Sequence, residues 1–197
     1  MKVNIAISNH HVHLKQDDLN ILFGQPLEID RPLTQADEYA SKFYVNIKGP
    51  KGEIDHVRVL GPLRPYTQVE ISRTDAYRLG VNPPIRNSGV LLDSAPITII
   101  GPKGTVNLDS GCILATRHIH MNPTDAKEYG YTNDQLVSVK IDTVKGGIMN
   151  NVHIKITPKG VLEMQLDTDD GNGFYIEKGT KGEIIEWNFI DVQYVVM

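Results

Sequence analysis

The chain has 197 residues, of which 40% are hydrophobic and 22% charged, and its formal net charge is −4. This composition supports a folded protein with a substantial core, and it argues against disorder. Lysine and arginine are not clustered, so we expect no nucleic-acid partner. No apolar run reaches the roughly 20 residues that span a bilayer, and the single cysteine, Cys112, cannot form an intrachain disulfide. We therefore expect a cytoplasmic protein with no membrane partner.

Short β-type segments dominate the chain, and turns containing Gly and Pro separate them. Several of these segments alternate apolar and polar residues, which is typical of half-buried strands. Three further segments place acidic residues in a first turn and end on glycine, which is typical of short helices. In chain order we expect a helix at 16–24, strands at 43–48 and 55–60, a helix at 72–80, a strand at 96–101, a helix at 122–130, and strands at 136–141, 151–156 and 161–166.

Two pairs of segments resemble one another inside the chain. Residues 45–62 and 97–114 each contain a strand, a Gly-Pro-Lys-Gly turn and another strand. Residues 71–80 and 120–130 share Thr-Asp-Ala ahead of a short helix. A repeat of this length indicates a domain duplication rather than a solenoid.

The duplication predicts a mainly β fold of two similar β-barrel domains with short capping helices. Residues 80–89 contain two prolines and two glycines that interrupt any regular element, so the boundary is expected there. We expect an N-terminal barrel over 1–84 and a C-terminal barrel over 85–197, and strands exchanged between the barrels are compatible with this division.

Each expected domain carries a His-x-His pair, formed by His11 and His13 and by His118 and His120. Residues two apart on a strand point to the same face, so each pair can offer two ligands to a zinc ion. The alternative is that both pairs are exposed histidines on strand faces. Four of the seven histidines lie in these two matching contexts, which favours the metal interpretation.

A third segment, GPLRPYTQVEIS, contains Arg64 and Glu70. The Glu70 carboxylate could complete a metal site begun by the first histidine pair. The guanidinium of Arg64 offers a planar fork of donors that suits an anionic oxygen group. The alternative is an ordinary surface ion pair between the two side chains.

Four motifs, SNHHVHL, GPLRPYTQVEIS, RHIHM and EMQLDTDDGN, occur in order along nearly the whole chain. In this respect the chain resembles the phosphate propanoyltransferase family, the phosphotransacylase type found in propanediol utilisation. The resemblance implies a cytoplasmic enzyme with two zinc ions, built from two β-barrels, that transfers an acyl group between coenzyme A and inorganic phosphate. It implies one zinc on His11, His13 and Glu70, and a second on His118, His120 and a third residue.

The resemblance also assigns residues to the substrates. Arg64 matches the family's phosphate-handling arginine. The positions expected to contact coenzyme A are Ser8, Arg31, Arg58, Leu60 and Asn172. Some family members carry an N-terminal extension that directs them to a microcompartment. We expect none here, because only ten residues precede the first histidine pair, and we expect a homo-oligomer.

The chain departs from the family pattern at two positions. His10 stands where the family has an arginine, and we expect it at the surface or behind a metal ligand. Gln165 stands where the family has the third histidine of the second zinc, and an amide oxygen is a weaker zinc ligand than imidazole. Gln165 could coordinate weakly, His153 could substitute for it, or the second metal could be weak or absent. The alternative for His153 is a strand histidine that faces solvent.

We expect phosphate to attack the thioester of an acetyl or propanoyl group directly, with no covalent acyl-enzyme. Cys112 is expected to pack in the core rather than act as a nucleophile. Two alternatives stay open. The first is a degenerate family member that binds coenzyme A or metal with little turnover. The second is a hydrolytic two-metal enzyme with acidic ligands, for which the sequence offers Asp167, Asp169 and Asp170, although such turns are more often solvated loops or caps.

Overall fold

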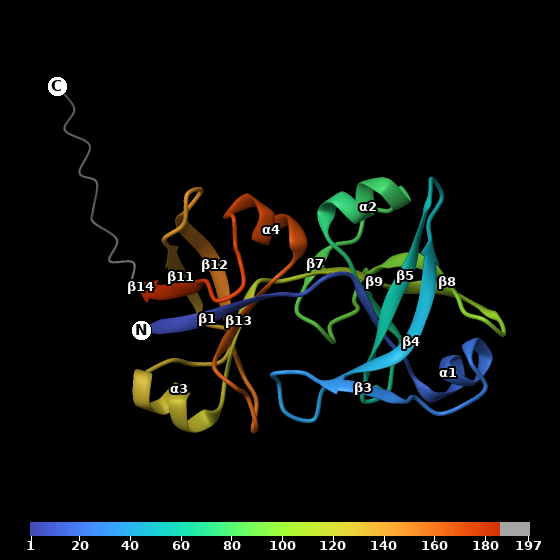
Figure 1. Cartoon of the computed structure of the whole chain (residues 1–197), viewed down its shortest axis with the longest axis horizontal. Helices are drawn as coiled ribbons and strands as arrows, with labels where there is room; N and C mark the ends of the chain where they lie inside the picture. The colour runs from blue at the N-terminus through green and yellow to red at the C-terminus, as the bar shows by residue number, and fades with distance from the viewer. Residues whose placement is uncertain (186–197) are drawn as a thin grey trace.

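Two β-barrels and four short helices make up the part of the protein that the computed structural model describes, residues 1–185 (Figure 1). The expected mainly β fold with two barrels and short helices is confirmed. No helix in this range has the length and apolar character needed to cross a lipid bilayer.

The first barrel closes in the order β4-β5-β2-β6-β9-β8, because β8 pairs back onto β4. Its strands are β2 (His11–His13), β4 (Tyr39–Lys48), β5 (Glu53–Gly61), β6 (Gln68–Glu70), β8 (Ala95–Ile100) and β9 (Thr105–Ala115), with β3 (Ile29–Pro32) and β7 (Ile85–Arg86) at its margins.

The second barrel closes in the order β1-β13-β10-β12-β11-β14. Its strands are β1 (Lys2–Ile7), β10 (His118–Met121), β11 (Leu136–Ile141), β12 (Gly147–Ile156), β13 (Glu163–Leu166) and β14 (Lys181–Ile185).

The two barrels repeat one pattern of strand pairing around their histidine strands. In the first barrel, β2 lies between the parallel strand β5 and the antiparallel strand β6. In the second, β10 lies between the parallel strand β12 and the antiparallel strand β13. Each residue beside one histidine pair therefore has a counterpart beside the other.

The chain crosses between the barrels more than once. Strand β1, from the N-terminal end, pairs with β13 and β14 of the second barrel. It appears in Figure 1 as a blue strand among the orange and red elements. Strands β8 and β9 follow residue 84, yet they belong to the first barrel. The sheets therefore do not divide at the boundary between residues 84 and 85.

Side chains cap the N-terminal ends of three of the four helices, whereas no side chain caps the first one. In α2, Ser72 and Asp75 form a reciprocal capping box, and Gly80 ends the helix in the left-handed conformation. Asn122 caps α3, which also ends on a left-handed glycine, Gly130. Asp167 caps α4, a helix that the sequence did not predict. The four helices are α1 (Gln16–Leu22), α2 (Arg73–Leu79), α3 (Pro123–Tyr129) and α4 (Thr168–Gly173).

Both Gly-Pro-Lys-Gly turns lie in the first barrel, one between β4 and β5 and the other between β8 and β9. Each turn covers the end of a helix. The backbone N–H of Lys51 donates to the carbonyl of Leu79 at the end of α2 (2.9 Å), and that of Lys103 donates to Leu22 at the end of α1 (3.1 Å). The repeated sequence thus serves two helix ends of one barrel, rather than one in each barrel.

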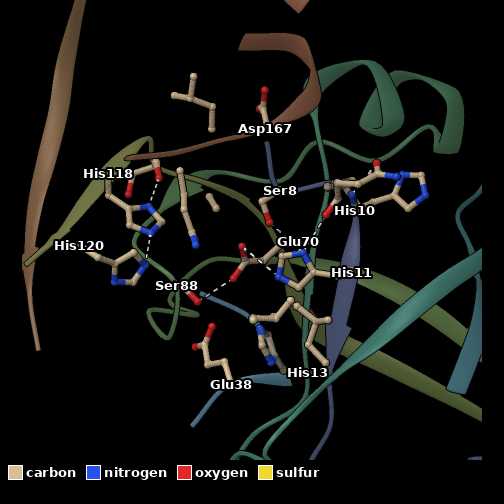
Figure 2. A pocket seen from close by; sticks show the side chains of 18 of the residues that line it. Ser8, His10, His11, His13, Glu38, Glu70, Ser88, His118, His120 and Asp167 are labelled. Atoms are coloured by element: carbon tan, nitrogen blue, oxygen red, sulfur yellow. Dashed lines mark hydrogen bonds and ion pairs between the residues drawn. The ribbon is translucent and has the colours of Figure 1, made fainter. Parts of the chain in front are cut away.

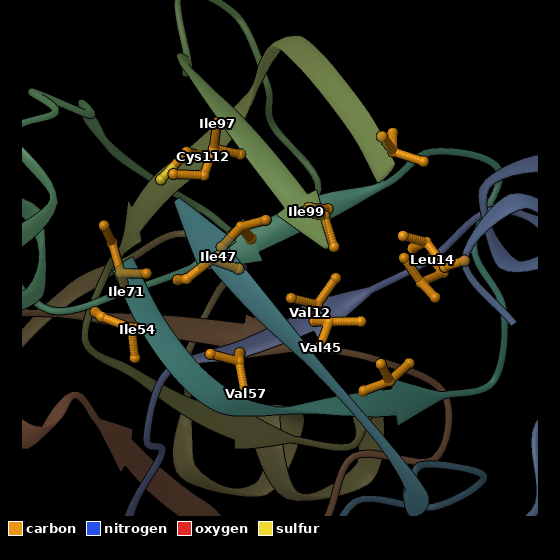
Figure 3. Close-up of a cluster of buried hydrophobic side chains, with 14 of the residues drawn as sticks. Val12, Leu14, Val45, Ile47, Ile54, Val57, Ile71, Ile97, Ile99 and Cys112 are labelled. Atoms are coloured by element: carbon orange, nitrogen blue, oxygen red, sulfur yellow. The ribbon is translucent and has the colours of Figure 1, made fainter. Parts of the chain in front are cut away.

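Each barrel has its own apolar core, and the residue between the histidines of each pair lies in it. Val12 and Ile119 are both fully buried, so each flanking pair of imidazoles faces away from the core. Cys112 packs in the first core near Ile97 (Figure 3), and burial raises the pKa of its thiol to about 12. The expectation that Cys112 is a packed core residue agrees with this position.

Candidate active site between the two histidine pairs

Both histidine pairs line a single pocket (Figure 2). We call His11, His13 and Glu70 the first half-site, and His118, His120 and Gln165 the second half-site. Both half-sites belong to this pocket. Of the remaining expected site residues, the pocket also contains Ser8, Leu60 and Arg64.

The first half-site brings three ligand atoms, one from each residue, within 4.8 Å of one another. The His11 Nδ1 donates to the carbonyl oxygen of Asn9 (2.8 Å), which directs its Nε2 toward Glu70, 3.5 Å from Oε2. A backbone carbonyl that fixes one ring nitrogen is the usual support for a metal-ligating histidine. This geometry suits a divalent cation.

Glu70 is buried and ionised. Burial alone would raise its pKa, but the neighbouring His11 and the hydroxyl of Ser88, which donates to Oε1 at 2.6 Å, bring the pKa below its ordinary value. The Gln68 side-chain amide also donates to Oε1. These contacts hold the Glu70 carboxylate in its anionic form, facing His11, its partner across β2 and β6.

The second half-site repeats the support of the first. His118 Nδ1 donates to the carbonyl oxygen of Thr116 (2.8 Å), so its Nε2 faces His120 Nε2 at 3.0 Å. Gln165 pairs with His118 in the register that Glu70 has with His11, and it hydrogen-bonds to His120. The third position therefore carries a neutral amide in place of a carboxylate.

Three of the four imidazoles, those of His13, His118 and His120, are neutral at physiological pH. Burial lowers the pKa of His118 to about 4 and that of His120 to about 3, and it lowers the pKa of His13 well below its ordinary value. Neutral imidazole is the form that binds metal. Among residues 1–185, the Nδ1 atoms of His13 and His120 are buried without a hydrogen-bond partner, which also fits histidines shaped for a metal.

Cationic side chains lie beside the half-sites. Arg64 donates to the Ser88 hydroxyl (3.0 Å) and lies 3.6 Å from a Glu38 carboxylate oxygen, so it is held inside the pocket rather than in solvent. Lys155 of β12 also lines the pocket. Arg64 was expected here from its motif, whereas Lys155 and Ser88 were not expected. Their local sequences carry no motif, and only long-range strand pairing brings them to the site.

Four of the five residues expected to contact coenzyme A, Ser8, Arg31, Arg58 and Leu60, line a groove beside the pocket. Arg58 lies over the Tyr44 ring at 4.5 Å and donates to the Ser41 carbonyl at 2.7 Å. The groove and the pocket share residues such as Ser8 and Leu60, so they are continuous.

Asn172, the fifth of these residues, is exposed on α4 and lines neither the pocket nor the groove. His10 lines both the pocket and the groove, and its Nδ1 contacts Asp75 of α2 (3.2 Å). His153 is half-buried and pairs with His118 in register, and it borders a neighbouring cleft that shares His118 and Lys155 with this pocket. The expected solvent-facing histidine is therefore partly covered.

Comparison with known proteins decides the family. The model of the phosphate propanoyltransferase family matches residues 4–177. The chain belongs to this family.

Relatives in several bacteria support the assignment. A phosphate propanoyltransferase of Thermotoga maritima is 45% identical over 186 residues, which cover 93% of this chain and 89% of that protein. One of Salmonella typhimurium is 44% identical over 172 residues, covering 86% and 82%. One of Rhodobacter capsulatus is 43% identical over 177 residues, covering 89% and 82%. As a member of the phosphate propanoyltransferase family, this protein is an acyltransferase.

Proposed function

We propose that this protein transfers an acetyl or propanoyl group reversibly between coenzyme A and inorganic phosphate. The relatives' name gives the propanoyl and phosphate chemistry, and the pocket supplies residues for it. The observation that carries the proposal is the convergence of two histidine pairs, one buried carboxylate and one arginine on a single pocket. A hydrolytic two-metal enzyme needs carboxylates that bridge its ions, whereas the one ligand cluster found among residues 1–185 contains only the carboxylate of Glu70.

We propose that zinc binds both half-sites, with Gln165 as the weakest ligand. A zinc ion with an open position can polarise a thioester carbonyl and ligate the leaving thiolate. Both half-sites border the groove that contains Arg31 and Arg58, the first through His11 and the second through Gln165, and so a thioester bound in the groove can reach both. We propose that the exposed Asn172 on α4 contacts a part of coenzyme A that extends beyond this groove.

The residues of this chain orient the two reactants. Arg64, held by Ser88, can donate two parallel hydrogen bonds to a phosphate dianion. A phosphate oxygen then attacks the carbonyl carbon of the thioester, the carbon–sulfur bond breaks, and the thiolate leaves as acyl phosphate forms. Positioning both reactants in one pocket makes this attack nearly intramolecular. The positive charge of Arg64 stabilises the oxyanion that develops.

No covalent acyl-enzyme is required. Cys112 lies in the first core with a pKa of about 12, so it supplies no thiolate to the pocket. Ser88 is the hydroxyl that Glu70 contacts, and an acylated Ser88 is the outcome that would contradict direct attack. Mass spectrometry of the protein quenched during turnover with acyl-coenzyme A distinguishes the two routes.

The deciding experiment measures acyl-phosphate formation from acetyl- and propanoyl-coenzyme A and inorganic phosphate. We expect turnover by the wild type and a loss of about 100-fold or more for Arg64→Gln, since removal of a single oxyanion-stabilising donor costs that much. Arg78→Gln, on the exposed face of α2, is the matched control. Binding of coenzyme A without product would indicate a degenerate member. Hydrolysis of p-nitrophenyl phosphate without acyl transfer would overturn the proposal.

A further inference from the structure

Lys155 is a cation of the pocket that neither the motifs nor the family comparison assigns. It lies on β12 in register with His120 of β10. Its side chain is half-buried and lines the same pocket as Arg64 and the second half-site. Its ammonium contributes to lowering the pKa of both His118 and His120, which places its charge close to the two rings.

The ammonium of Lys155 has no partner in the described part of the chain. No hydrogen bond or ion pair engages it, and burial lowers its pKa. Lys159, on the following turn, is by contrast paired with Asp37 at 2.6 Å. A partly buried charge without a counterion is costly, and folded proteins seldom retain one without a use.

The nearby carboxylates are already engaged. Glu70 and Glu38 both favour the charged form of Lys155, but neither lies within ion-pairing distance of it. Glu70 accepts hydrogen bonds from Ser88 and Gln68, and Glu38 lies 3.6 Å from Arg64. The pocket therefore retains an uncompensated positive charge beside the second half-site.

The correspondence between the barrels shows that the two half-sites have different residues in register with their second histidines. Leu60 pairs with His13 in the register that Lys155 has with His120. The first half-site thus combines a carboxylate ligand with an apolar neighbour. The second combines the neutral amide of Gln165 with an ammonium. The second half-site is therefore the more suitable of the two for a dianion.

Lys155 is also reachable from the side away from the proposed coenzyme A groove. It borders two further clefts, one with His153 and Asn133 and one with Asp37 and Pro158. Neither cleft contains Arg31 or Arg58, which mark the groove. An anion can therefore approach Lys155 while acyl-coenzyme A occupies the groove.

We propose that Lys155 is a second phosphate-binding residue, which holds inorganic phosphate against the second half-site together with Arg64. This inference rests on the proposed acyl transfer for its biological meaning. The ammonium donates to phosphate oxygens from the β12 side of the pocket. Phosphate would then lie between Arg64, which is contributed by the first barrel, and Lys155 of the second.

The test is direct binding of inorganic phosphate, measured by isothermal titration calorimetry at matched metal content. We expect Lys155→Met to weaken phosphate binding about tenfold or more, the effect of losing one charged hydrogen bond. Lys155→Arg should restore most of the affinity. Lys140→Met, an exposed lysine of the neighbouring strand β11, is the matched control and should bind like the wild type. Coenzyme A affinity should change less than about twofold in all three variants.

Two further readouts separate binding from a structural role. Removal of an unpaired, partly buried charge should leave the melting temperature of Lys155→Met unchanged or higher, whereas a structural lysine would lower it. In the wild type, saturating phosphate should protect Lys155 from acetic anhydride, as read by peptide mass spectrometry. This measurement applies even if the variants fold poorly.

The outcomes distinguish this inference from the proposed function. Phosphate binding that depends on Lys155 in a protein without acyl transfer would overturn the function and support the inference. Acyl transfer by a protein whose phosphate affinity is the same in Lys155→Met, and whose Lys155 is not protected by phosphate, would support the proposed function and overturn the role of Lys155. A wild type that binds no phosphate at all would overturn the role of Lys155.

Discussion

Gln165 occupies in the second barrel the position that Glu70 occupies in the first. Glu70 faces His11 across β2 and β6, and Gln165 faces His118 across β10 and β13. The two half-sites therefore present the same number of side chains but differ by one negative charge. A cation in the second half-site gains less electrostatic stabilisation, while an anion is repelled less.

Restoring a stronger ligand at Gln165 should tighten metal binding. We expect Gln165→His to raise the zinc affinity of the second half-site by at least about tenfold, the lower end of what even outer contacts contribute to metal affinity. Chelator competition with measured metal content tests this. Gln16→His, on the exposed surface of α1, controls for a histidine added elsewhere. Equal affinity in Gln165→His and the wild type would show that residue 165 does not ligate the metal.

The thiol of Cys112 should be unreactive toward alkylating reagents in the native protein. Its burial in the first core and its pKa of about 12 predict no alkylation by iodoacetamide under native conditions and full alkylation in urea. Cys112→Ala should keep acyl transfer within about twofold while costing about 1 kcal/mol of stability through the space it leaves. Native labelling accompanied by loss of activity would contradict the core assignment.

The metal-stripped protein should lose stability as the pH falls below neutrality. His118 and His120 have native pKa values of about 4 and 3, below the ordinary histidine value near 6.5. At pH values between the native and the ordinary pKa, the unfolded chain binds protons that the native imidazoles do not bind. The free energy of unfolding therefore falls as the pH falls. Each ring contributes at most about 1.4 kcal/mol per pH unit in this window.

Urea unfolding of the metal-stripped protein at pH 7.5 and pH 5 measures this loss. His120→Gln should reduce the pH dependence, because it removes one of the rings that resist protonation. His56→Gln, at an exposed position of β5, should leave the pH dependence as it is. An equal free energy of unfolding at both pH values would rule out buried neutral imidazoles.

Replacement by alanine should change the free energy of unfolding in opposite directions at two of the glycines. A Cβ on Gly49 would press against the Leu79 carbonyl at the end of α2, and such overpacking costs about 1–3 kcal/mol. A Cβ on Gly173 meets open space within α4, so Gly173→Ala should stabilise the protein by about 0.5–1 kcal/mol. Urea unfolding midpoints of the two variants check the contrast. A Gly49→Ala protein as stable as the wild type would show that this turn can move away from α2.

Local patterns in the sequence predicted the elements that are built locally. The helices α2 and α3 carry their own caps at Ser72 and Asn122 and end on glycine, so they were expected. Helix α4 was missed because Gly171 and Gly173 lie inside it, and glycine disfavours a helix interior. Asp167 was considered a candidate ligand, or else a cap or a solvated loop residue, and its side chain caps α4.

The composition of the pocket could be predicted only in part, for a physical reason. His11 and His13 share a face because they are two apart on one strand, which the sequence shows directly. Lys155 and Ser88 reach the pocket through contacts with strands and loops far away in the chain. The sequence around each of these two residues does not indicate which distant segments they contact. The similar Gly-Pro-Lys-Gly turns were a poor guide to the duplication, because both of them serve the first barrel.

The placement of β1 in the second barrel has a consequence for how the protein is made. Among the strands of residues 1–185, β1 is translated before all the others, whereas its partners β13 and β14 are translated after them. The first barrel can close once residue 115 has left the ribosome, whereas β1 must wait until residue 185 is available. During that interval β1, with its apolar residues Val3 and Ile5, lacks its partner strands. Its protection from wrong partners then depends on how quickly translation reaches the final strand.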